Sequence, residues 1–289
     1  MLPDGPPEAT CIAAERILLA RRRTAPDMDG ALTAALVAGC GALPPDGPAL
    51  RAARAIAAEV ERHGASFRPG AEPAYHNRHH QAEATLAMGW MCGRARIAGA
   101  LDAADALLGV AAMAAHDLLH PGGTGTRLHE LEERSAQAAA ILAGAAGAAP
   151  DWIAALRDIV LATGWPRDPG EIRMPPLHRL AREADLFGSV TPHLGPCLSR
   201  SLAAEFAAAG VPGATAIGTH RGRLGFLLSL PEFTPAGCAL GMGWARETQR
   251  AAYARCAPDG DAMAGAAALD GLAPHAAKAR YAQAREAAP

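Results

Sequence analysis

The sequence predicts an all-α protein, and three features favour this class. Half of the 289 residues are hydrophobic, with alanine dominating that half, whereas aromatic residues make up only 4%. Alanine favours helices, and a sheet would need more β-branched and aromatic side chains. Apolar residues also recur at helical spacing along most of the chain. Because only 19% of the residues are charged, the composition is that of a globular protein rather than a disordered one.

The first 70 residues are predicted to form a helical extension. Their apolar residues recur at helical spacing in three stretches, namely Glu8 to Arg23, Met28 to Gly41 and about Ala49 to His63. The proline-rich run at 44–48 separates the second stretch from the third, because proline cannot continue a helix. We therefore divide the chain into an N-terminal helical extension, 1–70, packed on a core domain with C-terminal helices, 71–289.

A histidine-rich segment opens the next predicted helix. The sequence Tyr-His-Asn-Arg-His-His at 75–80 leads into an apolar stretch that runs to about Cys92. If this segment is helical from its start, His76 and His80 lie four residues apart on one helix face. Asn77 either caps a helix or holds the adjacent histidines in position.

A second pair of histidines stands at the end of the following helix. The apolar run from about Leu107 ends in His116-Asp117, and His120 comes four residues after His116. Pro121 then breaks the helix. A buried carboxylate beside a histidine costs several kcal/mol unless its charge is compensated, and a bound metal ion would compensate it.

Two more segments supply acidic residues. The stretch from Leu128 opens an alanine-rich helix. Its Glu132 and Glu133 either stabilise the helix by interacting with the positive end of the helix dipole or orient water near a metal ion. The helix from about Leu177 carries Asp185 among apolar neighbours, an unfavourable place for an unpaired charge.

The remaining segments are predicted to be a loop and a helical scaffold. A helix from Trp152 to Thr163 is followed by a proline-rich loop, Pro166 to Pro176, which we expect to act as a lid. Four further helices are expected at Leu198 to Ala209, Ala214 to Leu230, Ala236 to Arg255 and Ala262 to Ala287.

Charge and hydropathy exclude several classes of partner. The formal net charge of −2 gives no electrostatic case for nucleic acid or an anionic membrane. No segment approaches about 20 uninterrupted apolar residues, so no membrane span is predicted. The first residues lack the basic start and apolar core of a secretory signal. We expect a cytoplasmic protein that acts on a small molecule.

The candidate metal ligands are two imidazoles and two carboxylates on three predicted helices. In chain order they are His80, His116, Asp117 and Asp185. This mixture suits one or two divalent ions such as Zn, Mn, Fe or Mg. A site with open coordination positions lowers the pKa of a bound water and holds it beside a phosphate, so hydrolysis is the chemistry we expect.

This pattern resembles the HD-domain superfamily of metal-dependent phosphohydrolases, whose signature is His, then His-Asp, then a distant Asp on a helical bundle. The segment 75–80 is similar to the Tyr-His-Asn-x-x-His of cyclic-nucleotide phosphodiesterases, and 116–122 is similar to their His-Asp-x-x-His-Pro-Gly. The resemblance covers about residues 75–230. It implies an HD/phosphodiesterase-like helical bundle with extra N- and C-terminal helices.

The resemblance also implies a role for each motif residue. It makes His80, His116, Asp117 and Asp185 the ligands of a first metal ion, with Asp117 bridging to a second ion held mainly by water.

It implies that His76, Asp117 and His120 are the catalytic residues. His76 is then the general acid that protonates the leaving alkoxide, and His120 lies close to the second ion. An imidazole one helical turn from a metal ligand also suits proton transfer at neutral pH on chemical grounds. The expected reaction is attack of a metal-bound hydroxide on a phosphate ester, with phosphodiesters and nucleotides among the candidate substrates.

The sequence departs from these relatives in three places. Leu128 to Ala139 looks more like the Asn-Glu-Glu-x-Ser-Ala segment of small bacterial HD hydrolases. Those relatives have Thr-x-x-His where this chain has Thr-Gly-Trp-Pro at 163–166, so a histidine ligand for the second ion is missing there. The glutamine that holds the base in cyclic-nucleotide enzymes has only Gln249 as a counterpart.

Two alternatives remain open. Some HD-type proteins hold two irons and oxidise their substrate, but that site needs more protein ligands, and the missing histidine counts against it. A helical scaffold stapled by a metal ion is the other alternative. A structural site needs no acid beside it, so His76 counts against that interpretation.

Overall fold

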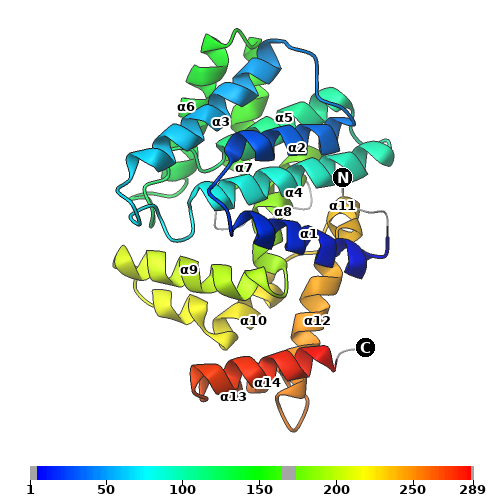
Figure 1. The fold of residues 1–289 in the computed structure, drawn as a ribbon, viewed down its shortest axis with the longest axis vertical. Coiled ribbons are helices and arrows are strands. Elements are labelled where there is room, and N and C mark those ends of the chain that lie inside the picture. The colour runs from blue at the N-terminus through cyan, green and yellow to red at the C-terminus, as the bar shows by residue number, and fades with distance from the viewer. Residues whose placement is uncertain (1–4, 165–173, 288–289) are drawn as a thin grey trace.

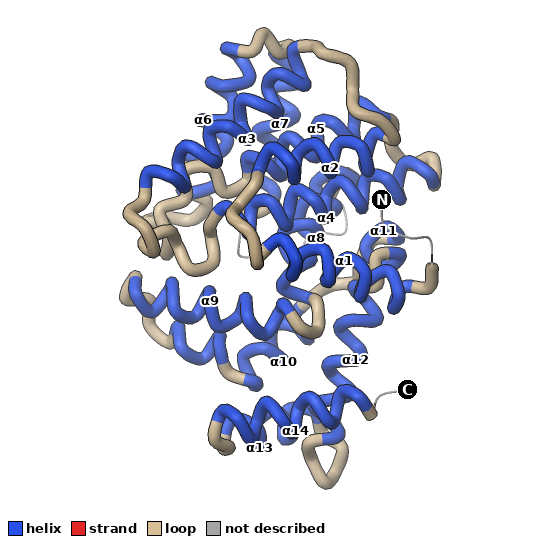
Figure 2. The backbone as a smooth tube through the Cα atoms, viewed as in Figure 1, coloured by secondary structure: helices blue, strands red, loops and turns tan. Residues whose placement is uncertain are grey.

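The computed structural model describes residues 5–164 and 174–287, and the description below concerns these residues. They form fourteen α-helices and one short 3-10 helix, with no β-strand (Figures 1 and 2). The predicted all-α class is confirmed. None of the helices in this part of the chain combines the length and hydrophobicity that a membrane span requires.

The helices occupy most of the chain. Their bounds are α1 (Pro7–Arg21), α2 (Met28–Cys40), α3 (Pro48–Ser66), α4 (Arg78–Ile97), α5 (Ala103–Ala115), α6 (Glu130–Ala145), α7 (Pro150–Ala162), α8 (Pro176–Val190), α9 (Leu194–Ala208), η2 (Ala214–Gly218, the 3-10 helix), α10 (His220–Ser229), α11 (Pro235–Ala239), α12 (Met242–Arg255), α13 (Ala262–Asp270) and α14 (Pro274–Glu286).

Helix α4 is the central element, because α2, α5 and α8 all pack against it. Every residue from His80 to Gly93 is buried. Two glycines let α2 approach closely: a Cβ added at Gly89 would lie 2.4 Å from the carbonyl oxygen of Ala35, and one at Gly93 would lie 2.5 Å from that of Ala38. The backbones of α2 and α4 are therefore in direct contact, which fixes the position of the helix that carries His80.

One hydrophobic core runs through most of the molecule. Buried side chains of α1, α2 and α3, such as Cys11, Leu32 and Ile56, belong to the same cluster as Met88 of α4 and Met113 of α5. A smaller cluster around Tyr253 and Tyr281 joins α12 to α13 and α14. In Figure 1 these last two helices lie at the opposite end of the molecule from α6.

Three helices predicted as continuous are each divided, and the affected ranges are 214–230, 236–255 and 262–287. The hydroxyl of Thr219 accepts a hydrogen bond from the N–H of Gly222 and so starts a new helix, α10. Gly241 adopts φ +81°, a left-handed conformation that ends α11. Pro274 stands at the start of α14, where its fixed φ favours a first turn and its missing N–H is not needed.

The helix predicted from Tyr75 begins three residues later, at Arg78. Asn77 is its N-cap, since its side chain accepts a hydrogen bond from the N–H of His80. His76 therefore lies in the loop before α4 rather than on its helical face. The predicted lid, Pro166 to Pro176, falls mostly on residues 165–173, which lie outside the described residues.

Candidate metal centre and proton donor

Four predicted ligands meet where α4, α5 and α8 converge. The Nε2 atoms of His80 and His116 lie 3.3 Å apart. An oxygen of Asp117 lies 3.3 Å from His80 Nε2 and 3.2 Å from His116 Nε2. An oxygen of Asp185 lies 3.1 Å and 3.5 Å from the same two nitrogens. His80, His116 and Asp117 are mutually close enough to hold a metal ion, and Asp185 faces both imidazoles.

These distances fit a metal centre. Around an ion with bonds of about 2.1 Å, neighbouring ligand atoms are about 3.0 Å apart in an octahedron and about 3.4 Å apart in a tetrahedron. The five measured separations fall between 3.1 and 3.5 Å. Moreover, Oδ2 of Asp117 is buried and has no hydrogen-bond partner of acceptable geometry. A buried oxygen without a donor is costly unless a cation contacts it.

The tautomer of His116 also suits metal binding. Its Nδ1 lies 2.8 Å from the carbonyl oxygen of Met113. A carbonyl can only accept, so Nδ1 carries the proton, and in the neutral ring Nε2 presents a lone pair to the cluster. A hydrogen bond from the second ring nitrogen to a carbonyl is typical of metal-binding histidines.

The local sequence explains why His116 and Asp117 point inward. Helix α5 ends at Ala115, and His116 is its C-cap. The chain then turns back: the N–H of His120 donates to the carbonyl of Asp117, and Leu119 takes a positive φ of 63°. Ser135 of α6 donates its hydroxyl proton to the carbonyl of Leu118, which ties this turn to the bundle.

The four groups compensate one another electrostatically. Burial lowers the pKa of His80, but Asp117 and Asp185 outweigh this effect and raise its pKa to about 9. Burial also opposes protonation of His116, yet the same two carboxylates raise its pKa well above 6.5. Burial raises the pKa of the Asp117 and Asp185 carboxyls, but the neighbouring imidazoles have the larger effect. The pKa of each carboxyl is therefore lower than its usual value. A divalent cation would supply the two positive charges that the imidazole protons supply without it.

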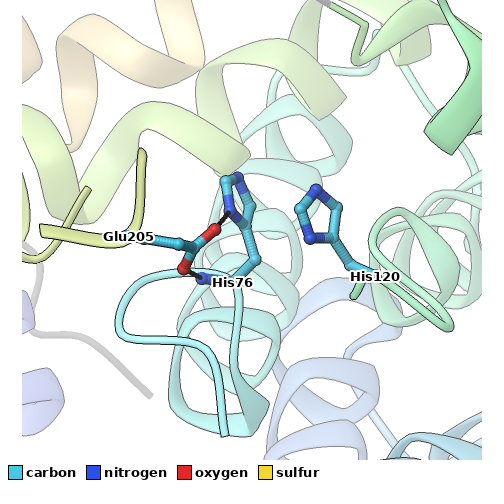
Figure 3. Close-up of side chains that lie close together, drawn as sticks. All are labelled: His76, His120 and Glu205. Carbon is cyan, nitrogen blue, oxygen red and sulfur yellow. Dashed lines mark hydrogen bonds and ion pairs between the residues drawn. The ribbon is translucent and has the colours of Figure 1, made fainter. Parts of the chain in front are cut away.

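A second cluster consists of His76, His120 and Glu205 (Figure 3). The ring of His76 lies between the other two side chains, with its Nδ1 2.5 Å from Oε1 of Glu205. One face of the His76 ring stacks on the ring of His120, with the two ring centroids 4.0 Å apart. The Nδ1 of His120 accepts a hydrogen bond from the N–H of Gly122, so the proton of its neutral form is on Nε2.

Glu205 of α9 was not anticipated from the sequence, which predicted only scaffold in this helix. Its carboxylate accepts hydrogen bonds from the backbone N–H groups of Tyr75, His76 and Gly123 as well as from the His76 ring. Burial raises the pKa of Glu205, but His76 and the backbone donors lower it to about 2. Burial and the charge of His76 lower the pKa of His120 to about 4. At neutral pH a charged carboxylate and a neutral His120 therefore flank His76.

Both clusters border one cavity of about 540 Å³. His116, Asp117 and Asp185 line it beside His76 and His120, while His80 is buried behind them. The cavity is also lined by apolar side chains of α9, η2 and α10, which form its apolar wall, namely Leu198, Leu202, Phe206, Ile217 and Phe226. The volume falls in the range of small-molecule sites.

The other candidate residues have different positions. Glu132 lines the cavity, whereas Glu133 pairs with Arg127 at the exposed surface. Gln249 is fully buried and bonded to Arg223 and to the carbonyl of Val190. It does not line the cavity, so it cannot hold a ligand there.

A scan of the sequence against models of protein families finds no match, and neither does a search of curated proteins.

Proposed function

We propose that this protein is a metal-dependent phosphohydrolase that cleaves a phosphate ester. The observation that carries the proposal is the joint placement of the His80-His116-Asp117-Asp185 cluster and an oriented imidazole, His76, at one cavity. A metal that only staples a fold needs neither a cavity nor an oriented proton donor. The order of these residues in the chain resembles the HD-domain pattern, and this supports the same class of reaction.

The chain's own residues account for ion binding. His80, His116, Asp117 and Asp185 would hold the first ion, and Glu132 is the further carboxylate that lines the cavity for a second. A divalent ion bound there would polarise the phosphate and lower the pKa of a bound water. Asp117 and Asp185 line the cavity, whereas His80 is buried, so an ion held by these side chains would lie at the cavity wall.

His76 is the proton donor in this proposal. Its Nδ1 proton is held by Glu205, so Nε2 is the nitrogen free to act in the cavity that the ring lines. Hydrolysis joins a water oxygen to phosphorus and breaks the bond from phosphorus to the ester oxygen. The imidazolium form of His76 gives its Nε2 proton to that leaving oxygen, while the Glu205 carboxylate stabilises the cationic ring. His120 stays neutral and packs on the ring.

Metal content and turnover test this proposal together. The protein is purified without chelators or a histidine tag, and metal is measured by mass spectrometry for the wild type, Asp117→Ala and His76→Ala. We expect one to two equivalents of Zn, Mn or Fe in the wild type and their loss in Asp117→Ala. His76→Ala should keep the metal and lose hydrolysis of dialkyl phosphodiesters, whose alkoxide needs a proton to leave, by 10²- to 10⁴-fold, the usual contribution of a general acid.

Three outcomes would contradict the proposal. Loss of metal from His76→Ala would make His76 a ligand rather than an acid. An iron-loaded wild type that consumes O₂ and cleaves no ester would favour an oxygenase. A wild type that binds no ion after reconstitution with each metal would be a helical scaffold.

A further inference from the structure

The cavity that receives the substrate carries few charges that could bind an anion. Its described lining residues include three carboxylates, Asp117, Asp185 and Glu132, and no lysine or arginine. Among the described lining residues, only imidazoles could face the phosphate with positive charge beside a bound metal ion. The three carboxylates would be engaged by that metal, so this part of the lining offers no further cationic side chain for additional negative charges on a ligand.

The same cavity offers little to read a nucleobase. No asparagine or glutamine lies among the described lining residues. Three of the hydroxyl groups there are already engaged by the protein: Ser229 donates to the carbonyl of Phe226, Thr163 donates to a carbonyl of its own helix, and Ser189 bonds the hydroxyl of Tyr75. Base recognition requires several placed donors and acceptors, which these groups do not supply.

Part of the cavity lining is instead apolar. Leu198, Leu202 and Phe206 of α9 line the cavity together with Ile217 of η2 and Phe226 of α10. The ring of Phe206 lies at 23° to that of His76 with centroids 6.4 Å apart, so the apolar wall begins directly beside the proton donor. A phosphate held between the metal cluster and His76 would therefore bring its second, non-leaving ester group within reach of this wall.

We infer that the substrate is a phosphodiester with one negative charge and at least one apolar ester group, aryl or branched alkyl, rather than a nucleotide or a polyphosphate. This inference rests on the proposed phosphohydrolase function and narrows its substrate. Water and the diester give a phosphomonoester and an alcohol or phenol, with the His76 proton on the latter. The monoester carries a second negative charge, for which the described lining residues offer no lysine or arginine.

Four substrates with the same leaving group test this inference on the Mn²⁺-reconstituted protein. Phenyl p-nitrophenyl phosphate, methyl p-nitrophenyl phosphate and thymidine 5′-(p-nitrophenyl phosphate) differ only in the second ester group, and p-nitrophenyl phosphate carries an additional charge. All four release p-nitrophenol, so differences in kcat/KM report how well the cavity accepts the second ester group or the additional charge. We expect the phenyl ester to exceed the methyl ester, the thymidine ester and the dianion by at least tenfold each.

A matched pair of variants connects this preference to the wall. Ile217→Asn places an amide in the apolar wall and should reduce the phenyl-to-methyl ratio by fivefold or more. Leu228 on α10 is 51% exposed and does not line the cavity, so Leu228→Asn should leave the ratio unchanged. Equal ratios in wild type and Ile217→Asn would show that the wall does not bind the ester group.

Binding without turnover provides an independent measurement. Diphenylphosphinate and dimethylphosphinate carry one negative charge and cannot be hydrolysed at phosphorus. Calorimetry should show at least tenfold tighter binding of the diphenyl compound, with a negative heat-capacity change from apolar burial. A preference for the thymidine ester with active hydrolysis would overturn this inference and leave the proposed function intact. Diphenylphosphinate binding without hydrolysis of any ester would instead refute the function.

Discussion

Replacing Glu205 by glutamine removes one negative charge from beside His76 and nearly preserves side-chain volume. The native carboxylate presents two acceptor oxygens: Oε1 faces the His76 ring and the N–H of Gly123, and Oε2 faces the N–H groups of Tyr75 and His76. In the variant, an NH₂ group takes one of these positions. At the Oε2 position it faces two backbone N–H donors and two hydrogen bonds are lost, whereas at the Oε1 position it can donate to the His76 ring and only the hydrogen bond from Gly123 is lost.

The structure gives the size of the effect on stability. The pKa of Glu205 falls from 4.5 to about 2 on folding, which corresponds to about 3 kcal/mol of stabilisation at neutral pH. Because the folded-state pKa is the lower one, this contribution is present above pH 4.5 and is lost as the pH falls to about 2. At pH 7 the free energy of unfolding of Glu205→Gln should therefore be about 3 kcal/mol lower than that of the wild type. Its stability should also change less between pH 5 and 2 than that of the wild type.

The effect on turnover follows from the proton on Nδ1. If the glutamine amide donates to Nδ1, the ring proton lies on Nε2 and no carboxylate charge remains beside the ring. We expect kcat for dialkyl phosphodiesters, whose alkoxide needs a proton to leave, to fall by 10²- to 10⁴-fold while metal content stays unchanged. Glu247→Gln is the control, since Glu247 is half-exposed and pairs with Arg250 at the surface. A kcat within threefold of the wild type, with metal retained, would refute the orienting role of Glu205.

Three other predictions concern the ligands and the fold. Metal affinity, measured by chelator competition, should rise between pH 6 and 9. The raised pKa of His80 means that protons compete with the ion for this side chain up to about pH 9. A pH-independent affinity would contradict this prediction. In urea unfolding, Gly89→Ala should destabilise the fold by about 2 kcal/mol, because the new methyl group would overlap the backbone of α2. Gly243→Ala is the control: no atom lies close to the new methyl group, so this variant should stabilise the fold by up to about 1 kcal/mol. Glu15→Gln should cost about 2 kcal/mol at pH 7, because this buried carboxylate accepts two backbone N–H groups at the start of α9. Hydrogen bonds lower the pKa of Glu15 despite its burial, so its stabilisation is lost below about pH 4.5 and the difference between variant and wild type should shrink on acidification.

The helical class could be predicted because alanine and leucine repeat at helical spacing over long stretches. The prediction of three continuous C-terminal helices was wrong. The helical spacing of apolar residues continues through Thr219, Gly241 and Pro274, although the helices divide at these positions. The residue types there do carry the correct signal: a hydroxyl that caps, a glycine that turns and a proline that begins a helix. Capping residues therefore decide where these helices begin and end, and the apolar pattern does not.

The candidate ligands could be predicted because His116-Asp117 at the end of an apolar helix has partners elsewhere in the chain, His80 before it and Asp185 after it, in the order that resembles the HD-domain pattern. Glu205 could not be found in this way. It meets the N–H of His76 across 129 positions of sequence, and nothing in α9 distinguishes it from a surface glutamate. Its role depends on how the loop before α4 approaches α9, which is a property of tertiary packing.

The two walls of the cavity have a consequence for how proteins with this architecture could diverge. The candidate ion ligands belong to α4, α8 and the end of α5, whereas the apolar wall belongs to α9, η2 and α10. If the proposed function holds, mutations in the second set would exchange one ester group for another without altering the ligands of the ion. Glu205 is the exception, because it belongs to α9 and its carboxylate is bonded to His76, the proposed proton donor. A library randomised over the apolar wall should therefore yield new substrate preferences at many positions, but retain a carboxylate at 205 in every active member.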